Sequence, residues 1–106
     1  MNRQQQIDHF VGQAHQLAMQ RLREQPARVA EVVAQLAHWR TLAGRTRSDT
    51  YWDEWGNLLC GSVQALENAV CADTDHAAVL RSVSPMSVLI TQAERAQLLD
   101  QARRAS

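Results

Sequence analysis

Apolar residues recur every three or four positions along most of the chain, and this spacing constrains the fold more than any other feature of the sequence. Near the N-terminus the pattern follows the i, i+3, i+4, i+7 rule, which places apolar side chains on one side of a helix for about five turns. These positions are Ile7, Phe10, Val11, Ala14, Leu17, Ala18 and Leu22. No segment alternates apolar and polar residues for long enough to predict a strand. The sequence therefore predicts an all-α protein.

Proline and glycine mark the limits of two long helices. Pro26 disfavours helical geometry at the residue before it and suits the first turn of a helix, so the first helix is expected to end near Glu24 and a second to follow. Gly44 is expected to cap the second helix. Because the connection is short, the two helices are predicted to form an antiparallel hairpin. The apolar positions of the second helix are Val29, Val32, Val33, Leu36, Trp39 and Ala43.

Capping signals divide the remaining residues into shorter helices. Ser48 or Asp49 is expected to begin the third helix, Gly61 to end it and Ser62 to begin the fourth. Three further starts are predicted at Asp73–Asp75, at Ser84–Pro85 and at the capping box Thr91–Glu94. The expected architecture is one domain over residues 1–106, in which the N-terminal hairpin packs on a bundle of three or four short helices. Its core is expected to include Trp39, Trp52, Trp55, Leu58, Leu66, Leu80 and Leu89.

The stretch Tyr51-Trp52-Asp53-Glu54-Trp55 concentrates aromatic and acidic residues in one helix. Trp52 and Trp55 are three positions apart and share one side of that helix. Asp53 and Glu54 are adjacent, so their directions diverge by about 100° and they do not converge as an acid–base pair would. The stretch is therefore interpreted as an aromatic core side and a solvated acidic side.

Histidine and cysteine residues lack the spacings of a metal site or of an activated nucleophile. His9 and His15 are six positions apart, on different sides of a helix, and Cys60 and Cys71 are eleven apart in different helices. A zinc site of the two cysteines with one or two histidines is geometrically possible but has none of the usual ligand spacings. The segment 73–76 is better explained by helix capping than by carboxylate ligation, and no nucleotide-binding or nucleophile-elbow motif occurs. The sequence predicts no cofactor, no metal and no catalytic residue, and hence a protein that is not an enzyme.

Charge is balanced overall but uneven along the chain. The formal net charge is zero, which argues against non-specific binding to nucleic acid or to a membrane surface. Residues 1–48 carry seven arginines against three acids, whereas residues 49–106 carry four arginines against eight acids. The two halves are expected either to attract each other within the fold or to present a polar face to a partner.

The sequence also predicts a cytoplasmic protein. The N-terminal stretch is polar and lacks the apolar region of a secretory signal. No unbroken apolar run is longer than four residues, which is far too short to span a membrane. The two cysteines are expected to be reduced.

Three stretches of the chain share a pattern of packing and capping residues. They are "HQLAMQRLREQPARVAEVVAQLAHWR" (residues 15–40), "YWDEW" (residues 51–55) and "HAAVLRSVSPMSVLITQAER" (residues 76–95). In this pattern the chain resembles small, free-standing, all-helical bacterial proteins that look like the neutralising partners of toxin–antitoxin modules. It departs from them at Met86, where an aromatic residue is usual, and at residues 91–93, where a start containing proline is usual. The resemblance implies an interaction protein and supplies no catalytic residues.

The leading functional prediction is a non-enzymatic protein-binding module, specifically an antitoxin-like neutraliser of a protein encoded nearby. Its predicted partner surface combines the basic loop around Arg45 and Arg47, the acidic side chains of the third helix, and a turn whose Met-Ser-Val-Leu segment is expected to be exposed. The candidate residues are Arg45, Arg47, Asp53, Glu54, Met86 and Leu89. Homodimerisation through the hairpin is a further prediction. The alternative is a small DNA-binding regulator, although the short helices that would read DNA are net acidic.

Overall fold

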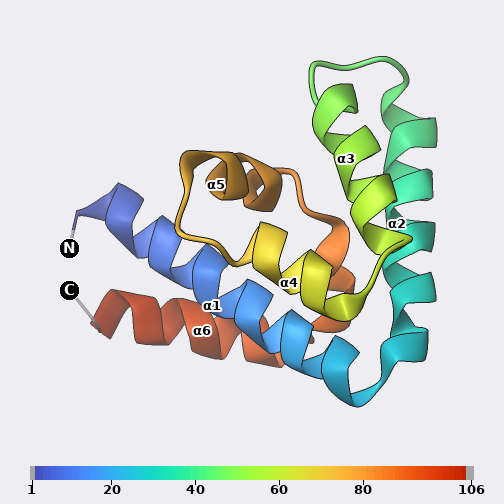
Figure 1. Ribbon diagram of the computed structural model, residues 1–106. Coiled ribbons are helices and arrows are strands. Elements are labelled where there is room, and N and C mark those ends of the chain that lie inside the picture. The colour runs from blue at the N-terminus through green and yellow to red at the C-terminus, as the bar shows by residue number, and fades with distance from the viewer. Residues whose placement is uncertain (1, 105–106) are drawn as a thin grey trace.

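A computed structural model describes residues 2–104 and shows an all-helical protein in that range, as predicted (Figure 1). Residues 2–104 form six α-helices and two short 3-10 helices. These are α1 (Arg3–Glu24), η1 (Pro26–Arg28), α2 (Val29–Ala43), α3 (Asp49–Leu59), α4 (Val63–Val70), α5 (Asp75–Ser82), η2 (Pro85–Leu89) and α6 (Gln92–Arg104). The two long N-terminal helices, the shorter ones that follow and the limits set by proline and glycine agree with the sequence prediction.

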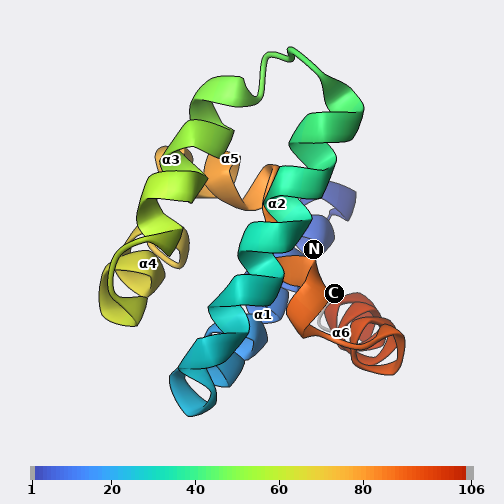
Figure 2. The ribbon, with the colours of Figure 1, turned by 90° about the vertical axis from the view of Figure 1, so that its right-hand side faces the viewer.

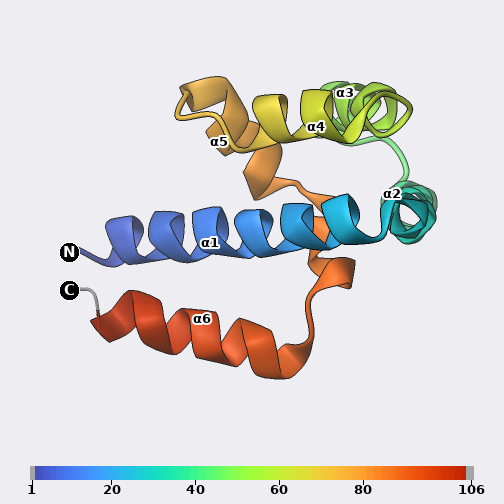
Figure 3. The ribbon, with the colours of Figure 1, turned by 60° about the horizontal axis from the view of Figure 1, so that its bottom comes forward.

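Helix α1 is the central element of the fold. Figure 3 shows α1 between α6 on one side and α4 with α5 on the other. Helices α2 and α3 lie together at the C-terminal end of α1 (Figure 2). The 3-10 helix η2 packs against both α1 and α2 and leads the chain from α5 to α6. The first and last helices are therefore neighbours, although almost the whole chain separates them.

The antiparallel hairpin expected of the two N-terminal helices is not confirmed. Helix α2 runs crosswise to α1, and it packs mainly against η2 and α3 (Figures 1 and 3). Gln25 leaves the helical conformation, with φ −137° and ψ 75°, and η1 then redirects the chain. A short connection limits the distance between two helix ends but not the angle between the helices. The helix that packs along α1 is α6, not α2.

Most of the predicted capping residues act as caps. The Ser62 hydroxyl accepts from the Ala65 amide at 3.0 Å, and the Thr74 hydroxyl accepts from the Ala77 amide at 3.1 Å. Gly44 ends α2 with a φ of 64°, a conformation that other residues rarely adopt. Ser48 stands at the start of α3 but makes no capping bond with its side chain. The helix limits were therefore encoded locally, in single residues.

The two tryptophans of α3 lie in the core, as predicted. Trp55 is completely buried and Trp52 is 8% exposed. The Trp55 indole N–H donates to the Leu80 carbonyl and the Trp52 indole N–H donates to the Val83 carbonyl, each at 3.0 Å, so both rings join α3 to the end of α5. The other expected core residues agree: Leu66, Leu80 and Leu89 are buried, and Trp39 and Leu58 are partly buried against them.

Three ion pairs join the basic half of the chain to its acidic half. Arg21 pairs with Glu94, Arg23 with Glu67 at 2.6 Å, and Arg40 with Asp53 at 2.7 Å. The opposite charges of the two halves are thus used, in part, inside the molecule.

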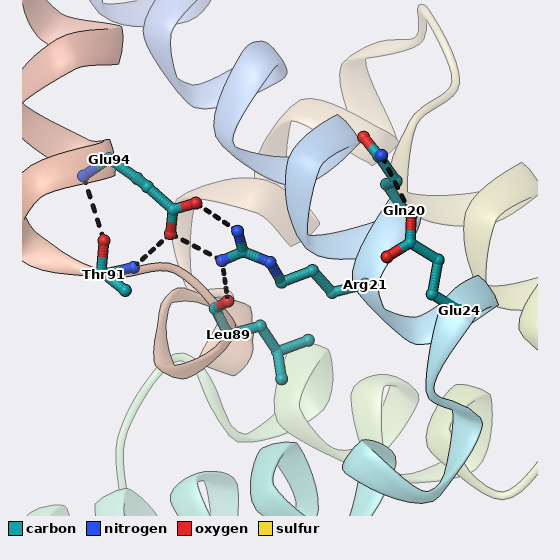
Figure 4. A network of polar contacts seen from close by, with 6 residues as sticks. All are labelled: Gln20, Arg21, Glu24, Leu89, Thr91 and Glu94. Atoms are coloured by element: carbon teal, nitrogen blue, oxygen red, sulfur yellow. Dashed lines mark hydrogen bonds and ion pairs between the residues drawn. The ribbon is translucent and has the colours of Figure 1, made fainter.

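The Arg21 pair is the centre of a larger network, shown in Figure 4. The guanidinium of Arg21 makes a two-bond contact with the Glu94 carboxylate and donates to the Leu89 carbonyl at 2.8 Å. The capping box is present as predicted: the Thr91 amide donates to Glu94 at 2.8 Å, and the Glu94 amide donates to the Thr91 hydroxyl at 3.1 Å. The hydrogen bonds from Arg21 and from the Thr91 amide lower the pKa of Glu94 to about 2. The network fixes the start of α6 against the C-terminal end of α1.

Candidate partner-binding surface

The arginine loop lies at one end of the molecule, where it joins α2 to α3 (Figures 1 and 2). Thr46 shapes this loop, since its hydroxyl donates to Asp49 at 3.3 Å and accepts from the Ser48 amide at 3.2 Å. Arg45 and Arg47 are exposed, and neither guanidinium has a hydrogen bond or ion pair to any residue from 2 to 104. The loop therefore presents two unneutralised positive charges to solvent.

The acidic side chains of α3 point away from the aromatic core, as the helical geometry predicts, but both have partners within the chain. Asp53 bonds to Arg40 of α2 at 2.7 Å, and Glu54 bonds to His76 of α5 at 2.8 Å. The side chain of Asp53 nevertheless remains 67% exposed. These two residues connect α3 to its neighbours, so a partner would have to compete with internal hydrogen bonds.

The predicted exposure of Met86 and Leu89 is wrong. Each is only 1% exposed, and both belong to the main hydrophobic core. In a 3-10 helix, side chains three positions apart point the same way, so η2 turns these two residues inward together. Val88, which lies between them, remains 38% exposed. The turn is therefore a core element, and the structure does not bring Met86 and Leu89 to the surface carrying the arginine loop.

Helix α2 has an exposed apolar side that the sequence prediction missed. Val32 and Leu36 face the core, whereas Val33, predicted to face inward, is 46% exposed. Spacings of three and four positions place Val33 on the same side as four small exposed residues. We call this set the outer face of α2: Ala30, Val33, Ala34, Ala37 and Thr41. Ile7 of α1 was also predicted to face inward and is 45% exposed.

Another exposed apolar residue of α2 lies near the arginine loop, on a different side of the helix from Val33, because nine positions correspond to two and a half turns. Leu42, in the last turn of α2, is 72% exposed, the largest exposure among the large apolar residues described. It precedes Arg45 by three positions in sequence. The signal that could have identified the outer face of α2 is the alanine spacing at positions 30, 34 and 37, on the side of the helix opposite Val32 and Leu36.

Across residues 2–104, no set of three or more histidine, cysteine or acidic side chains could hold a metal ion. His76 contacts Glu54 and lies near the Tyr51 ring, with ring centroids 6.2 Å apart, but both its partners serve packing between α3 and α5. Cys60 and Cys71 are both free thiols, and burial raises the pKa of Cys71.

The chain matches no protein-family model, and no curated protein or solved structure is significantly similar to it. None of the helices within residues 2–104 is long and apolar enough to cross a membrane.

Proposed function

We propose that the protein is a non-enzymatic binding module for another protein, and that α2 with its following loop is the contact surface. The observation that carries this proposal is that α2 is apolar on two opposite sides but covered on only one. A surface helix normally turns a polar side to water opposite its buried apolar side, so a second apolar side indicates a further contact. The uncovered side, which carries Val33 and three alanines, is therefore the side that a partner protein would bury.

The charges beside this face indicate the chemistry of the partner. Arg21, Arg23 and Arg40 are neutralised by carboxylates within the chain, whereas Arg45 and Arg47 are not. A matching surface would place an apolar patch against the outer face of α2 and acidic groups beside the loop. Such charges at the rim of an interface speed association and fix its orientation more than they add to affinity.

The specific form of the proposal is a neutralising partner of a protein encoded by the adjacent gene. It rests on the resemblance to antitoxin-type proteins described above and on the unneutralised loop. Pairing of two copies through the same face of α2 is the homodimeric form. DNA binding is less well supported, because helices α3, α4 and α5 expose acids such as Asp53 and Asp75 where a DNA-reading helix needs positive charge.

Co-expression of the tagged chain with the product of the adjacent gene tests the proposal. Val33→Glu should abolish co-purification, because it replaces the largest apolar side chain of the outer face with a charge. Val79→Glu is the matched control: Val79 is 36% exposed on α5, away from this face, and its replacement should leave co-purification unchanged. Arg45→Gln with Arg47→Gln should slow association at low salt and reduce its salt dependence.

Retention of the complex by Val33→Glu would refute the α2 surface, and absence of any complex with the adjacent gene product would refute the neutralising role. Sedimentation of the wild-type chain alone separates the homodimeric form, because a dimer through α2 should dissociate in Val33→Glu. Binding to DNA with a steep loss of affinity as salt rises would favour the regulator instead.

A further inference from the structure

A second feature, unrelated to the α2 surface, is a cavity of about 240 Å³ between α1, the end of α5, η2 and the start of α6. Phe10, Met86 and Ile90 form its apolar wall. His15, Arg81 and Arg95 contribute its principal polar groups, together with serine hydroxyls. The cavity thus joins an apolar wall to two positive charges and one imidazole.

His15 is the unusual member of this lining, because it is a buried polar side chain that lacks part of its hydrogen bonding. It is 7% exposed, and its Nδ1 lies 2.8 Å from the Val11 carbonyl. A carbonyl only accepts, so Nδ1 carries the ring proton and Nε2 of the neutral ring is left as an acceptor. Nε2 is buried and no donor from residues 2–104 reaches it. Burial and the nearby charge of Arg81 lower the pKa of His15, which keeps the ring neutral.

The two arginines give the cavity a positive character. The guanidinium of Arg81 donates to the Val70 and Ala72 carbonyls at 2.7 and 3.0 Å, which fixes its position without neutralising its charge. Arg95 lies over the Phe10 ring, 5.2 Å from its centre, and no carboxylate lines the cavity. A ligand that matches these groups must supply negative charge to the arginines and a hydrogen-bond donor to His15.

We propose that this cavity binds a small organic hydroxy acid, whose carboxylate lies at Arg81 and Arg95 and whose hydroxyl donates to Nε2 of His15. The apolar body of the ligand packs against Phe10 and the other wall residues. The volume admits one ring or a short chain. A fully deprotonated inorganic anion pairs with the arginines but cannot donate a hydrogen bond to the imidazole. A neutral alcohol can donate to the imidazole but has no negative charge for the arginines. The site is independent of the proposed protein-binding role.

Calorimetric titration of the wild-type chain with benzoate, with 2-, 3- and 4-hydroxybenzoate, and with phenol tests each part of the proposal. At least one hydroxybenzoate should bind about tenfold more tightly than benzoate, which is the value of one added hydrogen bond. Phenol should bind more weakly than that hydroxybenzoate. Equal affinities of benzoate and all three hydroxybenzoates, or no saturable binding at millimolar ligand, would overturn the proposal.

Two variants locate the site. Arg95→Gln should weaken the best hydroxybenzoate about tenfold, whereas Arg104→Gln, an equal change of charge at the exposed far end of α6, should leave its affinity unchanged. Arg95 is the cleaner choice of the two arginines, because Arg81 also holds two backbone carbonyls. His15→Phe should make benzoate and the hydroxybenzoate bind alike. If His15→Phe does not fold, the ring ¹⁵N resonances of wild-type His15 give the same information: Nε2 should shift on binding of the hydroxybenzoate, and an unchanged resonance would refute the contact.

Discussion

Replacing Trp55 with alanine should be among the most destabilising single changes in this chain. Its side chain is completely buried, and its indole N–H donates to the Leu80 carbonyl at 3.0 Å. The substitution removes both the packing of the ring between α3 and α5 and the hydrogen bond that orients it. The Leu80 carbonyl then keeps only the longer contact from the Val83 amide, at 3.3 Å.

The size of the effect follows from the area of the ring. Burial of a tryptophan removes about 150–250 Å² from water, worth about 4–6 kcal/mol at 25 cal/mol per Å². Alanine retains the Cβ and the neighbours relax partly into the space, so we expect the free energy of unfolding to fall by about 3–5 kcal/mol. For a domain of this length the corresponding decrease in Tm is about 15–25 °C. This is a large part of the stability of a typical small domain, about 5–15 kcal/mol.

Urea denaturation followed by circular dichroism measures the change. Asp53→Asn is the matched control from the same helix: its side chain is 67% exposed and its ion pair to Arg40 should contribute less than about 1 kcal/mol. Trp52→Ala should fall close to Trp55→Ala, because its ring is nearly as buried and also donates to a backbone carbonyl. A loss below about 1 kcal/mol for Trp55→Ala would refute the placement of this ring in the core.

Three further variants test the helix limits and the ion-pair network. Glu94→Gln should destabilise the protein at pH 7. Because the pKa of Glu94 is lowered to about 2 from 4.5, the greater stability of the wild-type protein should be complete above pH 4.5 and should disappear as the pH falls towards 2. Equal acid denaturation curves for the two proteins would contradict this. Gly44→Ala should lower the free energy of unfolding by about 1–3 kcal/mol, because the position has a φ of 64°. The space around Gly44 is open, so backbone strain is the only penalty. An unchanged thermal midpoint would show that the loop relaxes. Ser62→Ala removes the cap of α4 and should cost about 1 kcal/mol in urea denaturation, whereas Ser62→Thr should retain most of it.

The features that could be predicted from the sequence are those encoded by a few neighbouring residues. Pro26, Gly44 and Ser62 each determine a helix limit through their own backbone or side chain, and all three act where expected. The division of the segment 51–55 into a buried aromatic side and an exposed acidic side also follows from helical spacing alone. Local geometry decides these features, so no knowledge of the tertiary contacts was required.

Features that depend on contacts between distant segments could not be predicted in this way. Helix α2 runs crosswise to α1, and the helix that packs along α1 is α6, from the other end of the chain. Val33 and Met86 are comparable in hydrophobicity, yet the first is exposed and the second buried because η2 packs between long helices and α2 has only one covered side. His15 is a similar case, because four separate elements combine to form its cavity.

The antiparallel pairing of α1 and α6 has a consequence for chain connectivity. The N-terminal end of α1 and the C-terminal end of α6 lie side by side in all three ribbon views (Figures 1, 2 and 3). The described ends of the chain, at residues 2 and 104, are therefore close together at one edge of the molecule. A short glycine-rich linker could join these ends, and the exposed loop between α2 and α3 could supply new termini. Such a circular permutant would retain every helix and every ion pair between α1 and α6. In this molecule the order of the helices along the chain is therefore separable from their arrangement in space.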